Sequence, residues 1–276
     1  MDGDNALITL EGICFGYPGR PELFSGLDFT VRADDRLGVV GALGTGKTTL
    51  FHLLVGLQRP RAGRIRAFGR EVRKRSDYDE VRRAVGFLFQ HSEDQLFSPT
   101  VGEDVAFGPL NLGRSKPEAL RVVDETLARL GLSGYADRIS YDLSGGEKRL
   151  VALATVLAME PQVLLLDEPA GGLDPRTRAG LIELLARIGG TQVISSHDME
   201  FVRATCVRVV LLDNGKVITE GPTDEVLGDA DLMLRHGLEV PYSIEAHRGT
   251  GHDHRHGAGP SHGHGHDATH DTGQHG

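Results

Sequence analysis

The sequence predicts an α/β fold with a mainly parallel sheet, and three observations support that prediction. A glycine-rich loop at 41–48 lies between a short apolar run and a helical segment. Further along the chain, apolar runs of strand length alternate with amphipathic helical segments. A helical block from about residue 100 to 155 interrupts this alternation. We therefore expect a sheet with helices packed against it and an inserted α-helical subdomain.

Each element follows from a local pattern. Apolar runs or alternation between turn residues predict strands, and apolar residues spaced three or four apart predict helices. The predicted strands are 7–10, 27–31, 37–40, 85–89, 163–166, 192–195, 209–212 and 216–219. The predicted helices are 48–55, 117–130, 148–159 and 177–188. Asp213, Asn214 and Gly215 predict a hairpin turn between the last two strands.

Composition narrows the class of protein. The 276 residues are 39% hydrophobic and carry a net charge of −9, which argues against general nucleic-acid binding. A basic run at 59–75 is expected to be a solvated surface. Two cysteines suit a reducing compartment. The longest apolar stretch, 150–159, falls short of the roughly 18 residues of a membrane span, so we expect a cytosolic chain that docks on a membrane protein.

The loop at 41–48 fits the phosphate-binding pattern G-x-x-x-x-G-K-[ST]. Its glycines let the backbone approach an anion at a helix N-terminus. Lys47 supplies charge for the β- and γ-phosphates, and the Thr48 hydroxyl is a candidate ligand of Mg²⁺. The expected nucleotide contacts are Gly41, Ala42, Leu43, Gly44, Thr45, Gly46, Lys47, Thr48 and Thr49. The alternative is a glycine-rich turn that binds nothing.

Two carboxylates, Asp167 and Glu168, directly follow the predicted strand 163–166. Ligands of open α/β sheets bind at this carboxyl edge. Asp167 is expected to hold Mg²⁺, and Glu168 to polarise an attacking water. The structural alternative is a capped turn before Pro169.

A second helix start is predicted at 144–147, where Ser144 and Glu147 form a capping box. Gly145 and Gly146 leave the first N–H groups open, and we expect a free serine hydroxyl beside them. One nucleotide needs only one such terminus. The second one is therefore expected to serve the nucleotide of another subunit.

Together these motifs resemble those of ATP-binding cassette ATPases. The phosphate loop, Leu-Ser-Gly-Gly-Glu at 143–147, Leu-Leu-Leu-Asp-Glu-Pro at 164–169 and Ser-Ser-His-Asp at 195–198 occur in that family's order, and the resemblance covers about 5–245. It implies a P-loop NTPase with a RecA-like core and an antiparallel β subdomain. The implied units are a core at 1–90 and 156–245, a helical signature subdomain at 91–155 and a tail at 246–276.

The resemblance also implies residue roles. Tyr17 resembles the aromatic residue that stacks on adenine, and Gln90 the glutamine that senses Mg²⁺ and the attacking water. Asp174 lies in the loop that crosses the dimer interface, and His197 resembles the histidine that contacts the γ-phosphate. Structural alternatives are a turn residue for Tyr17, a surface amide for Gln90 and a strand-end core residue for His197. Leu43 departs from the family's usual polar residue, with no expected loss of phosphate binding.

The segment 87–112 looks like that of energy-coupling-factor importer ATPases. In that family this region docks on a transmembrane partner, which Leu96, Phe97, Val101, Val105 and Phe107 would suit. Ordinary subdomain core is the alternative. The implied partners are a second ATPase subunit and transmembrane coupling and substrate-binding subunits, which place the chain on the cytoplasmic face of the membrane as a peripheral protein.

The last thirty residues are rich in His, Gly, Asp and Thr, and we expect them to be disordered. Imidazole nitrogen is a common ligand of Ni²⁺ and Co²⁺. The candidate ligands are His252, His254, His256, His262, His264 and His266. A polar tail without a metal role is the alternative.

The sequence thus predicts an ATPase subunit that uses ATP and Mg²⁺ to power nickel or cobalt import. The chain is expected to pair with a second copy of itself or with a related chain. One alternative is the ATPase of a vitamin importer. Another is a nickel-enzyme maturation GTPase, which would need an Asn-Lys-x-Asp motif that this sequence lacks. A DNA-repair or chromosome-organising ATPase would need a long coiled coil between the loop and the signature, where no heptads occur.

Calorimetric titration tests the metal-binding tail. Full-length protein titrated with Ni²⁺, Co²⁺ or Zn²⁺ should release heat that a version ending near Ala246 does not, because the shortened chain loses the histidines. Equal, negligible heats from both proteins would remove the metal hypothesis.

Overall fold

The structure is a computed structural model that describes residues 5–244. The strands are β1 (Ala6–Phe15), β2 (Phe24–Arg32), β3 (Arg36–Val40), β4 (Ala62–Ala67), β5 (Arg70–Val72), β6 (Val85–Leu88), β7 (Val163–Asp167), β8 (Thr191–Ser195), β9 (Arg208–Asp213) and β10 (Lys216–Pro222). The α-helices are α1 (Lys47–Leu54), α2 (Arg75–Ala84), α3 (Val101–Asn111), α4 (Lys116–Arg129), α5 (Gly145–Leu157), α6 (Pro175–Ile188), α7 (Met199–Thr205), α8 (Thr223–Gly228) and α9 (Ala230–Arg235). Short 3-10 turns occur at η1 (Ser92–Gln95) and η2 (Ser140–Asp142).

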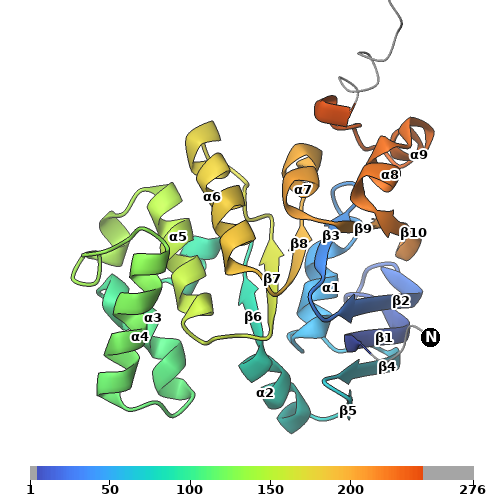
Figure 1. Ribbon diagram of the computed structural model, residues 1–276. Coiled ribbons are helices and arrows are strands. Elements are labelled where there is room, and N and C mark those ends of the chain that lie inside the picture. Colours follow the sequence, from blue (N-terminus) through green and yellow to red (C-terminus); the bar gives the residue numbers. More distant parts are fainter. Residues whose placement is uncertain (1–4, 245–276) are drawn as a thin grey trace, which may run out of the picture.

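The strands form two sheets (Figure 1). The larger has the order β10-β9-β3-β8-β7-β6, and its neighbours are parallel except for the β9–β10 hairpin. The smaller has the order β2-β1-β4-β5, and the pairs joined there are antiparallel. The expected mainly parallel α/β sheet with an antiparallel β subdomain is therefore confirmed.

Alternate residues of the central strands pack into two separate hydrophobic cores. Val163 and Leu165 of β7 face the core that contains α1 and the antiparallel sheet. Leu164 and Leu166 face the core that contains α5, α6 and α7. A strand buried on both faces needs a continuous apolar run, which is why 163–166 lacks polar residues.

Helices α3, α4 and α5 pack together as the inserted helical subdomain, at the left of Figure 1. The predicted helix 148–159 is wrong at its start, because α5 begins at Gly145. Ser144 is the N-cap, so the residues of the capping box form the first turn. Likewise α6 begins at Pro175, two residues before the predicted start, because Asp174 caps it.

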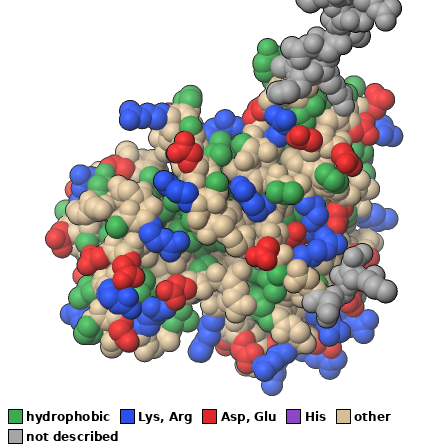
Figure 2. Space-filling model, in the orientation of Figure 1, with side chains coloured by type: hydrophobic (Ala, Val, Ile, Leu, Met, Phe, Trp, Pro, Cys, Tyr) green, Lys and Arg blue, Asp and Glu red, His purple; other side chains and the backbone are tan. Residues whose placement is uncertain are grey.

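The basic run at 59–75 forms β4, β5 and their connections, which the sequence patterns did not resolve into strands. Most of its arginines are exposed, and several pair with acids: Arg70 with Glu80 at 3.0 Å and Arg73 with Glu71 at 2.6 Å. Figure 2 shows basic and acidic side chains mixed along the lower edge of the view, where β5 and α2 lie in Figure 1. The structure therefore presents this run as a solvated ionic surface.

Among residues 5–244, no helix is both long enough and apolar enough to cross a bilayer.

Two glycines give a matched test of packing between α1 and α2. Gly56 and Gly12 both have positive φ, 70° and 61°. A Cβ on Gly56 would lie 2.1 Å from the Tyr78 ring, whereas a Cβ on Gly12 would meet no atom within 4 Å. Gly12→Ala should lower the free energy of unfolding by about 1–2 kcal/mol through its backbone conformation alone. Gly56→Ala should lose about 1–3 kcal/mol more by overpacking. Urea unfolding would measure both, and equal losses would contradict the packing argument.

Candidate nucleotide-binding site

The loop at 41–48 connects β3 to α1 and is closely packed at two of its glycines. A Cβ on Gly41 would lie 2.2 Å from the Leu212 carbonyl oxygen of β9. Gly46 has φ 103°, and a Cβ there would lie 2.8 Å from the ring of Phe24. Only glycine fits either place, so the surrounding strands fix the loop's shape.

Lys47 extends along the inside of this loop. Its Nζ donates to the carbonyl oxygens of Gly41 at 2.7 Å and Ala42 at 3.1 Å. Burial lowers the pKa of Lys47, and the nearby charges of Glu168 and Asp167 oppose that shift. The side chain thus places a cationic group between the phosphate loop and two carboxylates.

Asp167 ends β7 beside the start of α1. The Thr48 hydroxyl donates to its Oδ2 at 2.7 Å, and the Ser195 hydroxyl donates to its Oδ1. Ser195 is opposite Asp167 in the β7–β8 register. A hydroxyl and a carboxylate this close offer the hard oxygen ligands that Mg²⁺ prefers, so these residues fit a magnesium ion.

Glu168 is buried and has φ 48°, a left-handed conformation that is uncommon outside glycine. Its Oε2 lies 2.8 Å from His197 Nδ1 and accepts from the Ser196 hydroxyl at 3.2 Å. The His197 ring itself is exposed. The carboxylate of Glu168 is therefore held in one direction, with an exposed imidazole beside it.

A cavity of about 400 Å³ joins most of the predicted nucleotide-binding residues. Tyr17, Leu43, Gly44, Gly46, Lys47, Thr48, Thr49, Gln90, Asp167 and Glu168 line it. Arg20, Pro21, Glu22 and Leu23 complete its wall. The sequence patterns gave these four no site role, although they directly follow the turn after Tyr17.

Tyr17 is half-buried at one end of this cavity. Its hydroxyl lies 3.1 Å from Thr49 Oγ1, and its ring packs edge-on against Phe15 at 5.0 Å between centroids. Gln90 is exposed and is one of the residues that line the cavity. Both residues therefore adjoin the phosphate loop.

Three predicted residues lie in a neighbouring groove instead. Gly41, Ala42 and His197 line it, and Leu43 lies between groove and cavity. Thr45 is buried and donates its hydroxyl to the Ala42 carbonyl, which braces the loop.

Among the described residues, those at 144–147 are not part of the cavity lining. Ser144 and Gly145 are exposed at the start of α5. The expectation of a free hydroxyl is wrong. Ser144 Oγ donates to Glu147 Oε2 at 2.7 Å, because the capping box closes on itself. Glu147 also accepts from the Tyr135 hydroxyl at 2.7 Å.

Asp174 is the N-cap of α6. It accepts from the backbone N–H groups of Arg176 at 2.9 Å and Thr177 at 3.1 Å. A Cβ on Gly146 would lie 3.5 Å from the Thr177 methyl carbon. The beginnings of α5 and α6 are therefore adjacent, outside the cavity that holds the phosphate loop.

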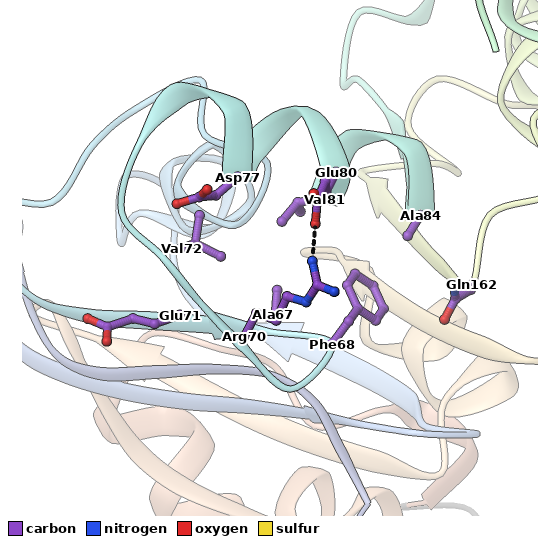
Figure 3. A pocket seen from close by; sticks show the side chains of 10 residues that line it. All are labelled: Ala67, Phe68, Arg70, Glu71, Val72, Asp77, Glu80, Val81, Ala84 and Gln162. Atoms are coloured by element: carbon purple, nitrogen blue, oxygen red, sulfur yellow. Dashed lines mark hydrogen bonds and ion pairs between the residues drawn. The ribbon is translucent and has the colours of Figure 1, made fainter. Parts of the chain in front are cut away.

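A different groove, of about 380 Å³, lies between β5 and α2 (Figure 3). The Arg70–Glu80 ion pair crosses it, as the dashed line in the figure marks. It contains none of the predicted site residues. The predicted nucleotide-binding residues therefore gather mainly at the phosphate-loop cavity and not in this groove.

The apolar residues of the segment 87–112 divide into two groups. Val101 and Val105 are buried in the subdomain core, and Leu96 is partly buried against it. Phe97 and Phe107 remain 65% and 50% exposed, with ring centroids 4.8 Å apart. Phe107 lines an apolar groove of about 620 Å³ between α3 and α4.

Among residues 5–244, no group of three or more His, Cys, Asp or Glu side chains could hold a metal ion. The six candidate histidines of the tail, His252 to His266, lie outside the described residues.

Three comparisons place the chain among known proteins. The family profile described as ABC transporter matches residues 24–171. A putative ABC transporter ATP-binding protein of Gloeobacter violaceus is 45% identical over 86% of this chain and 98% of that protein. The energy-coupling factor transporter ATP-binding protein EcfA of Methanothermobacter thermautotrophicus is 43% identical over 87% of this chain and 78% of its own length. The structure of cbiO1 from Clostridium perfringens, described as part of the ABC transporter complex cbiONQ, superposes with a TM-score of 0.76 at 31% identity, covering 89% of this chain and all of that one.

The capping box makes a prediction about ionisation. The Tyr135 hydrogen bond is the main cause that lowers the pKa of Glu147 from 4.5 to about 2. The ionised carboxylate therefore stabilises the folded state above about pH 4.5, and this contribution is lost as pH falls toward 2. Tyr135→Phe should raise the pKa of Glu147 toward 4.5 in a carboxyl NMR titration. Tyr141→Phe, which removes the hydroxyl of an exposed tyrosine whose ring lies beneath Lys148 Nζ, should leave it unchanged. Equal pKa values in both variants would contradict this assignment.

Proposed function

The chain belongs to the ABC transporter family of ATP-binding proteins, and on this premise we propose that it powers the import of nickel or cobalt. Its enzymatic activity is ATP hydrolysis, as the ATPase subunit of a transporter of the energy-coupling-factor kind. The observation that most strongly supports the assignment is the grouping of Lys47, Asp167 and Glu168 around one cavity beside His197.

The proposed chemistry begins with the phosphates of ATP. Lys47 lies where its charge would meet the β- and γ-phosphates, and the N–H groups of the loop and of α1 would surround them. Tyr17 would stack on adenine. Thr48, Asp167 and Gln90 would hold Mg²⁺, which when bound neutralises charge that develops on the phosphate oxygens.

Glu168 would orient the attacking water, because its carboxylate lies at the carboxyl edge of β7 and lines the cavity. His197, 2.8 Å from that carboxylate, would contact the γ-phosphate from the neighbouring groove. The water would give a proton to the Glu168 carboxylate and attack the γ-phosphorus in line as the bond to the β-phosphate oxygen breaks. Lys47 would stabilise the charge that spreads over the transferred group.

The exposed start of α5 supports a two-chain site. Ser144 and Gly145 are exposed and Gly146 is half-buried. None of the three lines the cavity of its own chain. We propose that they bind the nucleotide of a second ATPase subunit, with Glu147 closing the helix cap and Asp174 at the interface. ATP would then bridge two chains arranged head to tail, and loss of the γ-phosphate would let them separate.

The proposed units are the nucleotide-binding core at 1–90 and 156–245 and the signature subdomain at 91–155. The exposed Phe97 and Phe107 support docking of a transmembrane coupling subunit on the latter. A partner helix that covers these rings would remove apolar surface from water. The chain would thus act at the cytoplasmic face of the membrane, bound to transmembrane coupling and substrate-binding subunits.

The choice of nickel or cobalt rests on the histidines of the tail 246–276, which we propose as ligands of the transported metal. A vitamin importer is the alternative for a chain whose tail has no metal role. The two readings share the same ATP chemistry and differ only in cargo.

Glu168→Gln tests the proposed site. The amide keeps the shape of the side chain but cannot accept a proton from water, so the variant should bind ATP and accumulate as a closed dimer with turnover reduced about 100-fold or more. Size-exclusion chromatography with Mg-ATP and a phosphate-release assay would measure both effects. Glu183→Gln, an exposed acid of α6, is the matched control and should behave as wild type. Rapid turnover by Glu168→Gln would refute the role.

A further inference from the structure

Arg149 lies on α5, just after the signature residues 144–147, and its guanidinium contacts two other segments of the chain. Nη1 lies 2.9 Å from the Glu168 carbonyl oxygen, 3.0 Å from that of Pro169 and 2.8 Å from that of Gly171. Nη2 donates to the Gln90 carbonyl at 3.1 Å. One side chain therefore connects the signature helix, the Gln90 segment and the loop that follows β7.

All four of these bonds end on main-chain carbonyls rather than on carboxylates. Arg149 is half-buried, and burial lowers its pKa from the ordinary arginine value. A planar guanidinium with donors fixed in a fork suits several carbonyls that converge from different directions, as a flexible ammonium does not. The arrangement thus depends on arginine geometry as well as on positive charge.

The backbone that Arg149 contacts is the part that aims Glu168. Glu168 holds a left-handed φ of 48°, and its carbonyl also accepts from the Gly171 N–H at 3.1 Å, which closes a tight turn. Surrounding contacts must maintain such a conformation in a residue with a side chain. The bonds from Arg149 to both ends of the turn supply that support, while His197 contacts the carboxylate itself.

We propose that Arg149 is a positioning residue for ATP hydrolysis: it holds the backbone of Glu168 and Gln90 in register with the signature helix of the same chain. It does not line the nucleotide cavity, so it acts through these two residues. The proposal rests on the proposed function, in which that helix binds the partner's nucleotide. When the signature helix binds the partner's nucleotide, Arg149 would then hold Glu168 and Gln90 in place at the nucleotide site of its own chain.

The test uses full-length Arg149→Met and Arg149→Lys, with Arg121→Met as the control. Arg121 is an exposed arginine of α4 that pairs with Glu125. Arg149→Met should lower kcat about 10- to 100-fold, as expected for a misplaced catalytic group, while affinity for a fluorescent ATP analogue stays within about twofold. Arg149→Lys should recover part of kcat, because it retains the charge and some of the donors. Arg121→Met should match wild type.

A double variant separates positioning from folding. Glu168→Gln combined with Arg149→Met should still form the ATP-dependent dimer, because Arg149 acts on hydrolysis and not on closure. Loss of that dimer, an unchanged kcat in Arg149→Met, or a parallel fall of nucleotide affinity and unfolding temperature would each overturn the proposal. Failure of Glu168→Gln alone to dimerise would instead count against the proposed function.

Discussion

The nucleotide site depends on how β8 holds the end of β7. Two consecutive serines, Ser195 and Ser196, donate hydroxyl hydrogen bonds to the two consecutive carboxylates, Asp167 and Glu168. Parallel pairing places Asp167 opposite Ser195, so the strand register itself directs the acids. Because both strands are buried, each carboxylate keeps its partner and has little freedom to turn elsewhere.

The residues with predicted nucleotide roles lie on two separate surfaces of the chain. The phosphate loop, Lys47 and the acids converge on one cavity, whereas Ser144 and Asp174 start helices on an adjacent exposed surface. Arg149, on the helix that Ser144 caps, connects the two through hydrogen bonds to the backbone carbonyls of Glu168 and Gln90. In the proposed two-chain arrangement, each chain would offer half of one site and half of another.

Sequence patterns predicted the fold and the cavity residues well, because these depend on local signals. A glycine loop after an apolar strand and acids after a buried strand each occupy adjacent positions in the chain. The patterns failed where geometry is non-local. Nothing near Arg149 indicates that it will contact Gln90 or Gly171, and nothing near Arg20 or Leu23 indicates which cavity they complete. The strands β4 and β5 were not resolved because both are short: exposed and buried residues alternate only over 64–67 in β4, and β5 has three residues. The Ser144 hydroxyl was misjudged because both halves of a capping box bond to each other.

The approach of Gly41 to the Leu212 carbonyl has a consequence for biosynthesis. Strand β3 pairs with β8 and β9, both encoded in the last third of the described chain, so the loop that follows β3 is buttressed by segments translated long after it. Such long-range pairing is slow to form and cannot begin before its later partners leave the ribosome. A truncated nascent chain would therefore present the glycine motif without its supporting wall. The loop would therefore gain this supporting wall only after β9 has been synthesised.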